Sequence, residues 1–535
     1  PVGCAEVGAD ACAAINAAAR GREVVLVVAG AAEHAQLRAF AAAAATAGFH
    51  DQLLVATDDD ATAALAKGEL HLAAFTLRLP PPWPSPAGLL KYAALEAVLG
   101  AGCGVVFSSL TTKWSDAPFA YLYRDADVEA VAAGGRGGGR GRVGSVDDAV
   151  MGWSRMAQSL ILPPLSPNLF ALAATHQSLE LVRRLKHHLR DQANSDNKEL
   201  QQTTAPASEA YLLAEEVVAP AHDGTTRAGT SLRVLDGKCF AAGGGGGGGA
   251  VARAPAGEAE AYVSQNDILG SRDFRARSLV MRRGCAPVEA IEGAPTPRPL
   301  NWVIGEQEAW PPQAECDRLG LQALCETVAK VAVKREVIAA VSNKNIFHML
   351  QLFVDGIKAA GVPNSMVVAL DDETAAWLQE RQVAHYVKKI KSRTGSTDNH
   401  ATSGLKFKIL VDFLSVGASV LLSDVDVIWL QDPFRFLYRD SDVEGMSDGW
   451  DEPTAYGYDY GGGSLRVFAR NSGMFFLQAT KQSLGMMSRL AGRMEREGTW
   501  DQTAYNEEQF YPAHGTHGAV GVSSRVMNYF CNLNS

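Results

Sequence analysis

The chain has 535 residues, of which 47% are hydrophobic and 20% are charged, so it is long enough for several domains with large cores. Its formal net charge of −10 argues against a surface for nucleic acid. No run of eighteen uncharged apolar residues occurs, so the sequence predicts no membrane span in this chain. The eight cysteines are compatible with disulfides or with free thiols, and their spacing leaves both open.

Strands and helices alternate from the start of the chain. The apolar run 23–28 is typical of a buried parallel strand. Further strands are predicted at 52–56 and 105–107, and helices at 1–20, 34–47 and 89–99. A Pro-rich loop is predicted at 80–86. This alternation predicts an α/β fold with a largely parallel sheet.

The pattern of the first half returns about 300 residues later, a period far too long for a solenoid repeat. Residues 117–129 and 432–444 are identical at nine of thirteen positions. Shorter matches occur in the same order, including Arg22-Glu-Val with Arg335-Glu-Val and Pro220-Ala-His222 with Pro512-Ala-His514. We expect Cys12 and Cys325 to lie at equivalent places in the two copies. We therefore predict a tandem duplication, with domains at 1–290 and 314–535 and a Pro-rich linker at 291–313. Gly-rich insertions at 134–144 and 243–249 occur only in the first domain and are expected to be surface loops.

One stretch of the second half carries the clearest chemical signal. The apolar run at 420–422 leads into Asp424-Val-Asp426, which places two carboxylates at the carboxyl edge of a strand. Open α/β sheets bind their ligands at that edge. Two carboxylates at this spacing can hold a hard divalent cation that also grips a substrate diphosphate.

The first half lacks these polar residues at the matching positions. The pairs, second half first, are Asp424 with Ser109, Asp426 with Thr111, Asp432 with Ala117, Asp501 with Glu209, Gln502 with Ala210, Asn343 with Gly30, and Lys408 with Ala93. These substitutions fall at strand ends and not at random positions. We therefore interpret them as the loss of a functional site and not as ordinary divergence of surface residues. The first domain is therefore predicted to be non-catalytic.

Other residues of the second half are candidates for the same site. Asn343 follows the predicted strand 337–341, where it suits a nucleotide base or ribose or merely a turn. Lys406 and Lys408 lie on the predicted helix 405–414, and their spacing sends them to different faces, so at most one is expected to reach a diphosphate. Asp501 begins another predicted helix, as a site residue or as a plain cap.

Six motifs, taken in order, resemble glycosyltransferase family 77, and within it the extensin arabinosyltransferases of plants and green algae. They are Leu421-Leu-Ser-Asp-Val-Asp-Val, Met446-Ser-Asp-Gly-Trp, Thr454-Ala-Tyr-Gly-Tyr, Asn471-Ser-Gly-Met-Phe-Phe, Trp500-Asp-Gln and Phe510-Tyr-Pro-Ala-His. The set spans about residues 335–535, and the first half carries a degraded version.

The resemblance implies two tandem nucleotide-diphospho-sugar transferase folds of the GT-A kind. It implies that Asp424 and Asp426 hold Mn²⁺ on the diphosphate of a UDP-sugar, with Asp501 and Gln502 as catalytic residues facing the transferred sugar. The donor-binding residues that we expect are Asn343, Lys406, Lys408, Ser423, Asn471 and Ser472. The implied reaction retains the anomeric configuration.

The implied donor is UDP-β-L-arabinofuranose, and the implied acceptors are hydroxyproline-rich cell-wall glycoproteins in the Golgi lumen. Family members continue to a His-containing segment that this chain lacks, so we expect a catalytic domain truncated at its carboxyl end. Because the chain starts at Pro1, we also expect an amino-terminal membrane anchor outside it. Two alternatives stay open: a transferase that uses UDP-xylose or UDP-galactose, and a catalytically silent carbohydrate-binding or scaffolding protein.

Overall fold

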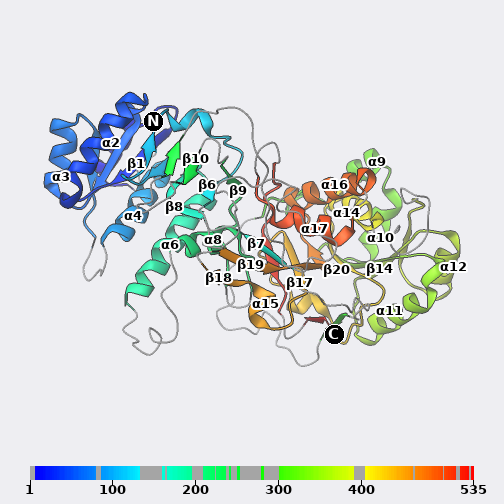
Figure 1. The fold of residues 1–535 in the computed structure, drawn as a ribbon. Coiled ribbons are helices and arrows are strands. Elements are labelled where there is room, and N and C mark those ends of the chain that lie inside the picture. The colour runs from blue at the N-terminus through cyan, green and yellow to red at the C-terminus, as the bar shows by residue number, and fades with distance from the viewer. Residues whose placement is uncertain are drawn as a thin grey trace.

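The structure is a computed structural model with two lobes, one for each half of the chain (Figure 1). It describes residues 7–79, 86–132, 159–162, 165–194, 209–222, 225–235, 240–242, 250–252, 279–281, 300–390, 404–461, 464–497, 499–513, 518–528 and 532–534. The two Gly-rich insertions and nearly all of the Pro-rich loop lie outside these ranges. Within them, no helix is both long and apolar enough to cross a membrane.

The first half contains a seven-stranded sheet in the order β3-β2-β1-β4-β8-β6-β9. In chain order its strands are β1 (Glu23–Val28), β2 (Leu53–Thr57), β3 (Ala73–Thr76), β4 (Gly104–Ser108), β6 (Val128–Ala132), β8 (Leu165–Leu172) and β9 (Leu232–Val234). The main helices are α1 (Ala9–Ala18), α2 (His34–Thr46), α4 (Pro86–Gly100), α6 (His176–Asn194) and α8 (Glu209–Val218). The strand predicted at 23–28 and its neighbours are thus confirmed.

The second half repeats this topology, in the order β15-β14-β13-β16-β20-β17-β21. Its strands are β13 (Glu336–Ser342), β14 (Ser365–Ala369), β15 (His385–Val387), β16 (Ser419–Ser423), β17 (Val443–Ser447), β20 (Arg470–Leu477) and β21 (Ser524–Val526). Its longer helices are α9 (Gln313–Leu319), α10 (Gln322–Val331), α11 (Phe347–Ala359), α12 (Asp372–Glu380), α14 (Leu405–Ser415), α16 (Lys481–Arg496) and α17 (Asp501–Phe510).

Both sheets are parallel at one end and mixed at the other. In the second sheet β15, β14, β13 and β16 run parallel, whereas β20 is antiparallel to its neighbours β16 and β17. The first sheet has the same pattern of directions. The predicted α/β class with largely parallel sheets is therefore confirmed.

The central strands have apolar residues at consecutive positions because they are covered on both faces. Within β13, Val337 and Ala339 face one core cluster, and Ile338 and Ala340 face the other. The strand β1 divides its valines and leucine between two clusters in the same way. A strand buried on both faces leaves its carboxyl end as the place where polar residues can gather.

The two halves contact one another through corresponding segments. The short strand β7 (Ser159–Leu162), just before β8, pairs antiparallel with β19 (Ser464–Phe468), just before β20, so that Leu160 lies opposite Val467 and Leu162 opposite Leu465. Two isolated bridges join Ala221 with Arg525 and Arg233 with Ala513. Such reciprocal pairing is the pattern of an interface with two-fold symmetry.

The described part of the linker, 300–312, packs on the second half. Trp310 donates from its indole N–H to the carbonyl of Val416 at 2.8 Å, and Val303 donates to the carbonyl of Ala479 at 2.9 Å. The domain limits at 290 and 314 remain predictions.

A disulfide joins Cys316 and Cys325, nine residues apart, on α9 and α10. Cys12 on α1 is also disulfide-bonded, whereas Cys103 is a free buried thiol. A cross-link of this loop length stabilises a fold by about 2–3 kcal/mol through the entropy of the unfolded chain. We expect the Cys316→Ala/Cys325→Ala variant to lose about that much free energy of unfolding in urea titration. A loss no larger than that of Cys103→Ala would contradict this expectation.

Candidate active site

Asp424 and Asp426 follow directly after the buried strand β16. The backbone N–H of Asp424 donates to the carbonyl of Gly473 on β20 at 2.7 Å, which continues the sheet pairing by one residue. Beyond Asp426, the side chains of Val427 and Trp429 are buried in the core. The chain is therefore fixed on both sides of the two carboxylates, and they lie at the carboxyl edge of the sheet.

Lys406, on the first turn of α14, connects this edge to α17. Its side chain is only 4% exposed, and Nζ lies 2.8 Å from Oδ2 of Asp501 and 4.0 Å from Oδ1 of Asp424. Ser472 on β20 adds to the cluster, with its hydroxyl 3.1 Å from Oδ2 of Asp501. Three elements that are distant in sequence thus bring one ammonium group and carboxylates together.

The charges of this cluster are unbalanced. Partial burial, and then repulsion from Asp426 and Asp501, raises the pKa of Asp424 to about 6, against the opposing effect of Lys406. Burial also raises the pKa of Asp426. For Asp501 burial acts in the same direction, but the Lys406 charge and hydrogen bonds outweigh it and lower the pKa. Three carboxylates therefore face one ammonium group, and 46% of the Asp424 side chain stays exposed to solvent.

Asn471 and Gln502 are held beside this cluster by Asp448, which sequence reasoning did not assign to the site. Asp448 accepts from Nδ2 of Asn471 at 3.2 Å and from Nε2 of Gln502 at 2.7 Å. Its only sequence signal is the motif Met446-Ser-Asp-Gly-Trp at the end of β17. Asp448 therefore orients two of the predicted site residues.

Gly473 is required by close packing at the same point. A Cβ added there would lie 2.7 Å from Oδ2 of Asp424 and 3.0 Å from Oδ1 of Asn471. Because real Cβ atoms do not approach so closely, any other residue would displace the Asp424 carboxylate. The segment Asn471-Ser-Gly473 thus helps to position the Asp424 carboxylate.

Two of the predicted donor-binding residues are engaged in other contacts. Lys408 forms an ion pair with Glu495 and does not join the cluster, since residues two apart on α14 point to different faces. Ser423 is fully buried and accepts a hydrogen bond from the indole of Trp429 at 3.1 Å. The first half has the same contact between Ser108 and Trp114, also at 3.1 Å, which indicates a role in packing.

Asn343 lies at the carboxyl end of β13, next to β16, and is 6% exposed. Its side chain accepts from the N–H of Asn345 at 3.0 Å and so caps the short helix Lys344–Ile346.

Asp501 is not a helix cap. Trp500 occupies the cap position of α17, and Asp501 is the first residue of that helix.

The first half keeps a counterpart of the buried ion pair of this site but has no counterpart of the carboxylates of Asp424 and Asp426. Lys91 on α4 is buried against Glu209 at the start of α8, in the arrangement that Lys406 has with Asp501. The position after β4 is occupied by Ser109, whose N–H donates to Asn168 as that of Asp424 donates to Gly473. Its hydroxyl lies 2.9 Å from that of Thr111. Among the residues of the first half that the structure describes, no carboxylate pair therefore stands at this edge of the sheet.

Residues 360–534 match the family described as nucleotide-diphospho-sugar transferase. The chain is 40% identical to arabinosyltransferase RRA2 of Arabidopsis thaliana over 228 residues, which cover 40% of this chain and 53% of the relative. It is 37% identical to arabinosyltransferase RRA1 of the same plant over 256 residues, covering 44% and 62%.

The structure of the galactosyltransferase LgtC, with donor and acceptor sugar analogues, is 14% identical and covers 36% of this chain and 72% of that chain. Its TM-score of 0.25 is too low to carry an argument. The chain spans a little more than half the length of the curated relatives that it matches. Residues 360–534 therefore resemble the nucleotide-diphospho-sugar transferase family, and the chain is similar in sequence to plant arabinosyltransferases.

Proposed function

We propose that this protein is a metal-dependent, retaining glycosyltransferase that moves L-arabinofuranose from a UDP-sugar to hydroxyproline-rich cell-wall glycoproteins. The observation that carries the proposal is the cluster of Lys406, Asp501, Asp424 and Asp426 at the sheet edge of the family-matching domain. The arabinosyltransferase names of the relatives support the choice of sugar.

Asp424 and Asp426 would supply two of the ligands of a divalent cation. Among the described residues no group of three or more His, Cys, Asp and Glu side chains forms a metal site, so Asp424 and Asp426 would need ligands from the donor diphosphate. Their excess negative charge beside one lysine is what a hard cation would offset. When bound, such an ion supplies Lewis-acid stabilisation of the leaving diphosphate.

The protein residues hold and orient the sugar. Asp501, fixed by Lys406 and Ser472, and Gln502, fixed by Asp448, present oxygen and nitrogen atoms beside the carboxylate pair. Because the Asp501 carboxylate already bonds to Lys406, we favour attack by the acceptor from the face that the diphosphate leaves, without a covalent enzyme intermediate. The bond from the anomeric carbon to phosphate oxygen breaks, the acceptor oxygen bonds to that carbon, and its proton passes to the diphosphate.

The loop after β17 offers a surface for the acceptor. Trp450, two residues beyond Asp448, is 54% exposed. Its ring packs edge-on against the ring of Phe468, with the ring centroids 4.9 Å apart. An exposed indole fixed in this way suits contact with the apolar face of a sugar.

A donor screen tests the proposal. We expect transfer from UDP-β-L-arabinofuranose to a hydroxyproline-rich peptide with Mn²⁺, and a fall of at least about 100-fold when EDTA removes the ion. Mass spectrometry of the peptide would detect the added pentose, and UDP-xylose and UDP-galactose are the comparison donors. Faster transfer from either comparison donor would contradict the assigned sugar. Full activity in EDTA would contradict metal dependence.

A further inference from the structure

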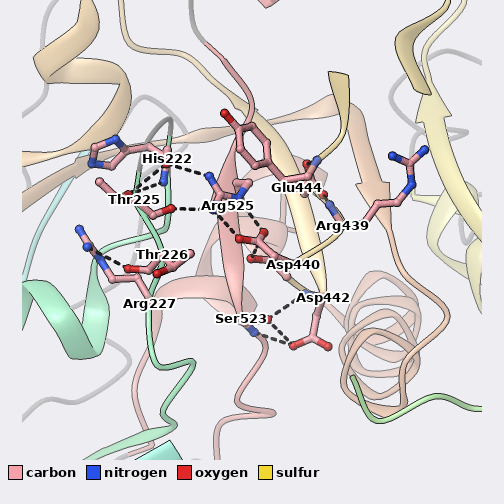
Figure 2. Close-up of polar contacts among 12 residues, drawn as sticks. His222, Thr225, Thr226, Arg227, Arg439, Asp440, Asp442, Glu444, Ser523 and Arg525 are labelled. Atoms are coloured by element: carbon pink, nitrogen blue, oxygen red, sulfur yellow. Dashed lines mark hydrogen bonds and ion pairs between the residues drawn. The ribbon is translucent and has the colours of Figure 1, made fainter. Parts of the chain in front are cut away.

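The first half fixes one of its loops firmly against the second half. Arg525 on β21 is fully buried and donates from Nη1 to the carbonyl of His222 at 2.8 Å and from Nη2 to that of Thr225 at 2.7 Å. Its Nε donates to Asp440 at 2.7 Å, which holds the guanidinium in place (Figure 2). The backbone around His222 is thus bonded to the sheet that carries the carboxylate pair.

The His222 ring packs on an aromatic ring of the second half. It stacks on Tyr456 with ring centroids 4.4 Å apart and an interplanar angle of 13°. Tyr456 is 7% exposed and is the last residue of the helix α15 (Glu452–Tyr456). The contact is therefore a specific one between the two halves, made by the buried Tyr456 and the partly buried His222.

The helix α15 belongs to the segment that carries Asp448. Its cap, Asp451, bonds to the N–H of Thr454 at 2.9 Å, and the buried Arg470 donates to the carbonyl of Ala455 at 3.2 Å. Eight residues before Tyr456, Asp448 holds Asn471 and Gln502 at the candidate active site. The segment 448–456 thus joins the interface between the halves to the site.

We propose that His222 is a positioning residue of the active site in the second half. By stacking on Tyr456 it fixes the segment 448–456, and through Asp448 it fixes Gln502 and Asn471. The first half, which has Ser109 and Thr111 in place of the carboxylates, acts as a structural part of the site. The effect on catalysis rests on the proposed function; the effect on the segment does not.

Hydrogen exchange tests the proposal without a substrate. In His222→Ala, we expect the amides of Thr454, Ala455 and Gly457 to exchange about tenfold faster, because the aromatic support of α15 is lost. His222→Phe keeps a stacked ring and should restore wild-type exchange. His187→Ala, an exposed histidine of the first half, is the matched control. Equal exchange in all four proteins would overturn the proposal.

Kinetics with the full chain give the second readout. We expect His222→Ala to lower kcat on the order of tenfold, with the donor KM within about twofold. The reason is that even a small displacement of the residues that orient the sugar lowers the rate of the chemical step. His222→Phe should recover most of the loss. An unchanged kcat in His222→Ala, or a loss that Phe does not rescue, would overturn the positioning role. If wild-type protein transfers no sugar, only the proposed function fails, and exchange still decides the role of His222.

Discussion

We expect Asp424→Asn and Asp426→Asn each to lower metal-dependent transfer by at least about 100-fold, since each removes one of the two anionic ligands that the chain offers a hard cation. The free energy of unfolding should not fall in Asp424→Asn, because burial and the neighbouring carboxylates raise the pKa of Asp424 and so disfavour the charge that Asn removes. Turnover and Mn²⁺-dependent UDP binding, measured with urea unfolding on the same samples, check both parts.

The first half offers a matched control for these substitutions. Ser109→Asp with Thr111→Asp restores the carboxylates after β4, but Glu209-Ala210 and Gly30 still differ from the second half. We expect no additional transfer and no additional UDP binding from this variant. Wild-type turnover in Asp424→Asn would contradict the metal assignment.

The two sheets could be predicted because their central strands are continuous apolar stretches of the sequence. The strands β1, β2, β4 and β13 fall within a residue or two of the predicted limits, since burial on both faces makes their central positions apolar. The place of Asp424 and Asp426 follows from the same fact, because a polar pair directly after such a run must lie at the strand end.

The side-chain contacts of the site residues could not be predicted from the sequence pattern. The spacing of Lys406 and Lys408 showed that at most one could reach the site, but only the fold shows that it is Lys406 that contacts Asp501 of α17 and Ser472 of β20. Asp501 lies 95 positions from Lys406, and no periodic pattern links them. Asp448 and His222 act through contacts between loops, where composition carries no signal for a specific pairing.

The buried ion pair between Lys406 and Asp501 leads to the second large expected effect. Lys406→Met keeps most of the side-chain volume but leaves the Asp501 carboxylate buried without its partner. Removing one member of a buried pair costs about 3–5 kcal/mol, and we expect a loss of that size in urea unfolding at neutral pH. Lys408→Met, two residues away and paired with the exposed Glu495, should cost no more than about 0.5 kcal/mol.

The pH dependence separates loss of the ion pair from loss of packing. In the wild-type protein the pKa of Asp501 is lowered, so its contribution to stability is lost only as the pH falls through that pKa. Without Lys406, burial raises the pKa of Asp501 above its unfolded value of about 3.9, so the variant loses stability as the pH rises above that value. The difference between Lys406→Met and wild type should therefore be largest near pH 7 and should shrink toward pH 4. A difference that is constant over this range would show that Lys406 acts through packing, and that the ion pair does not hold Asp501 ionised at the site.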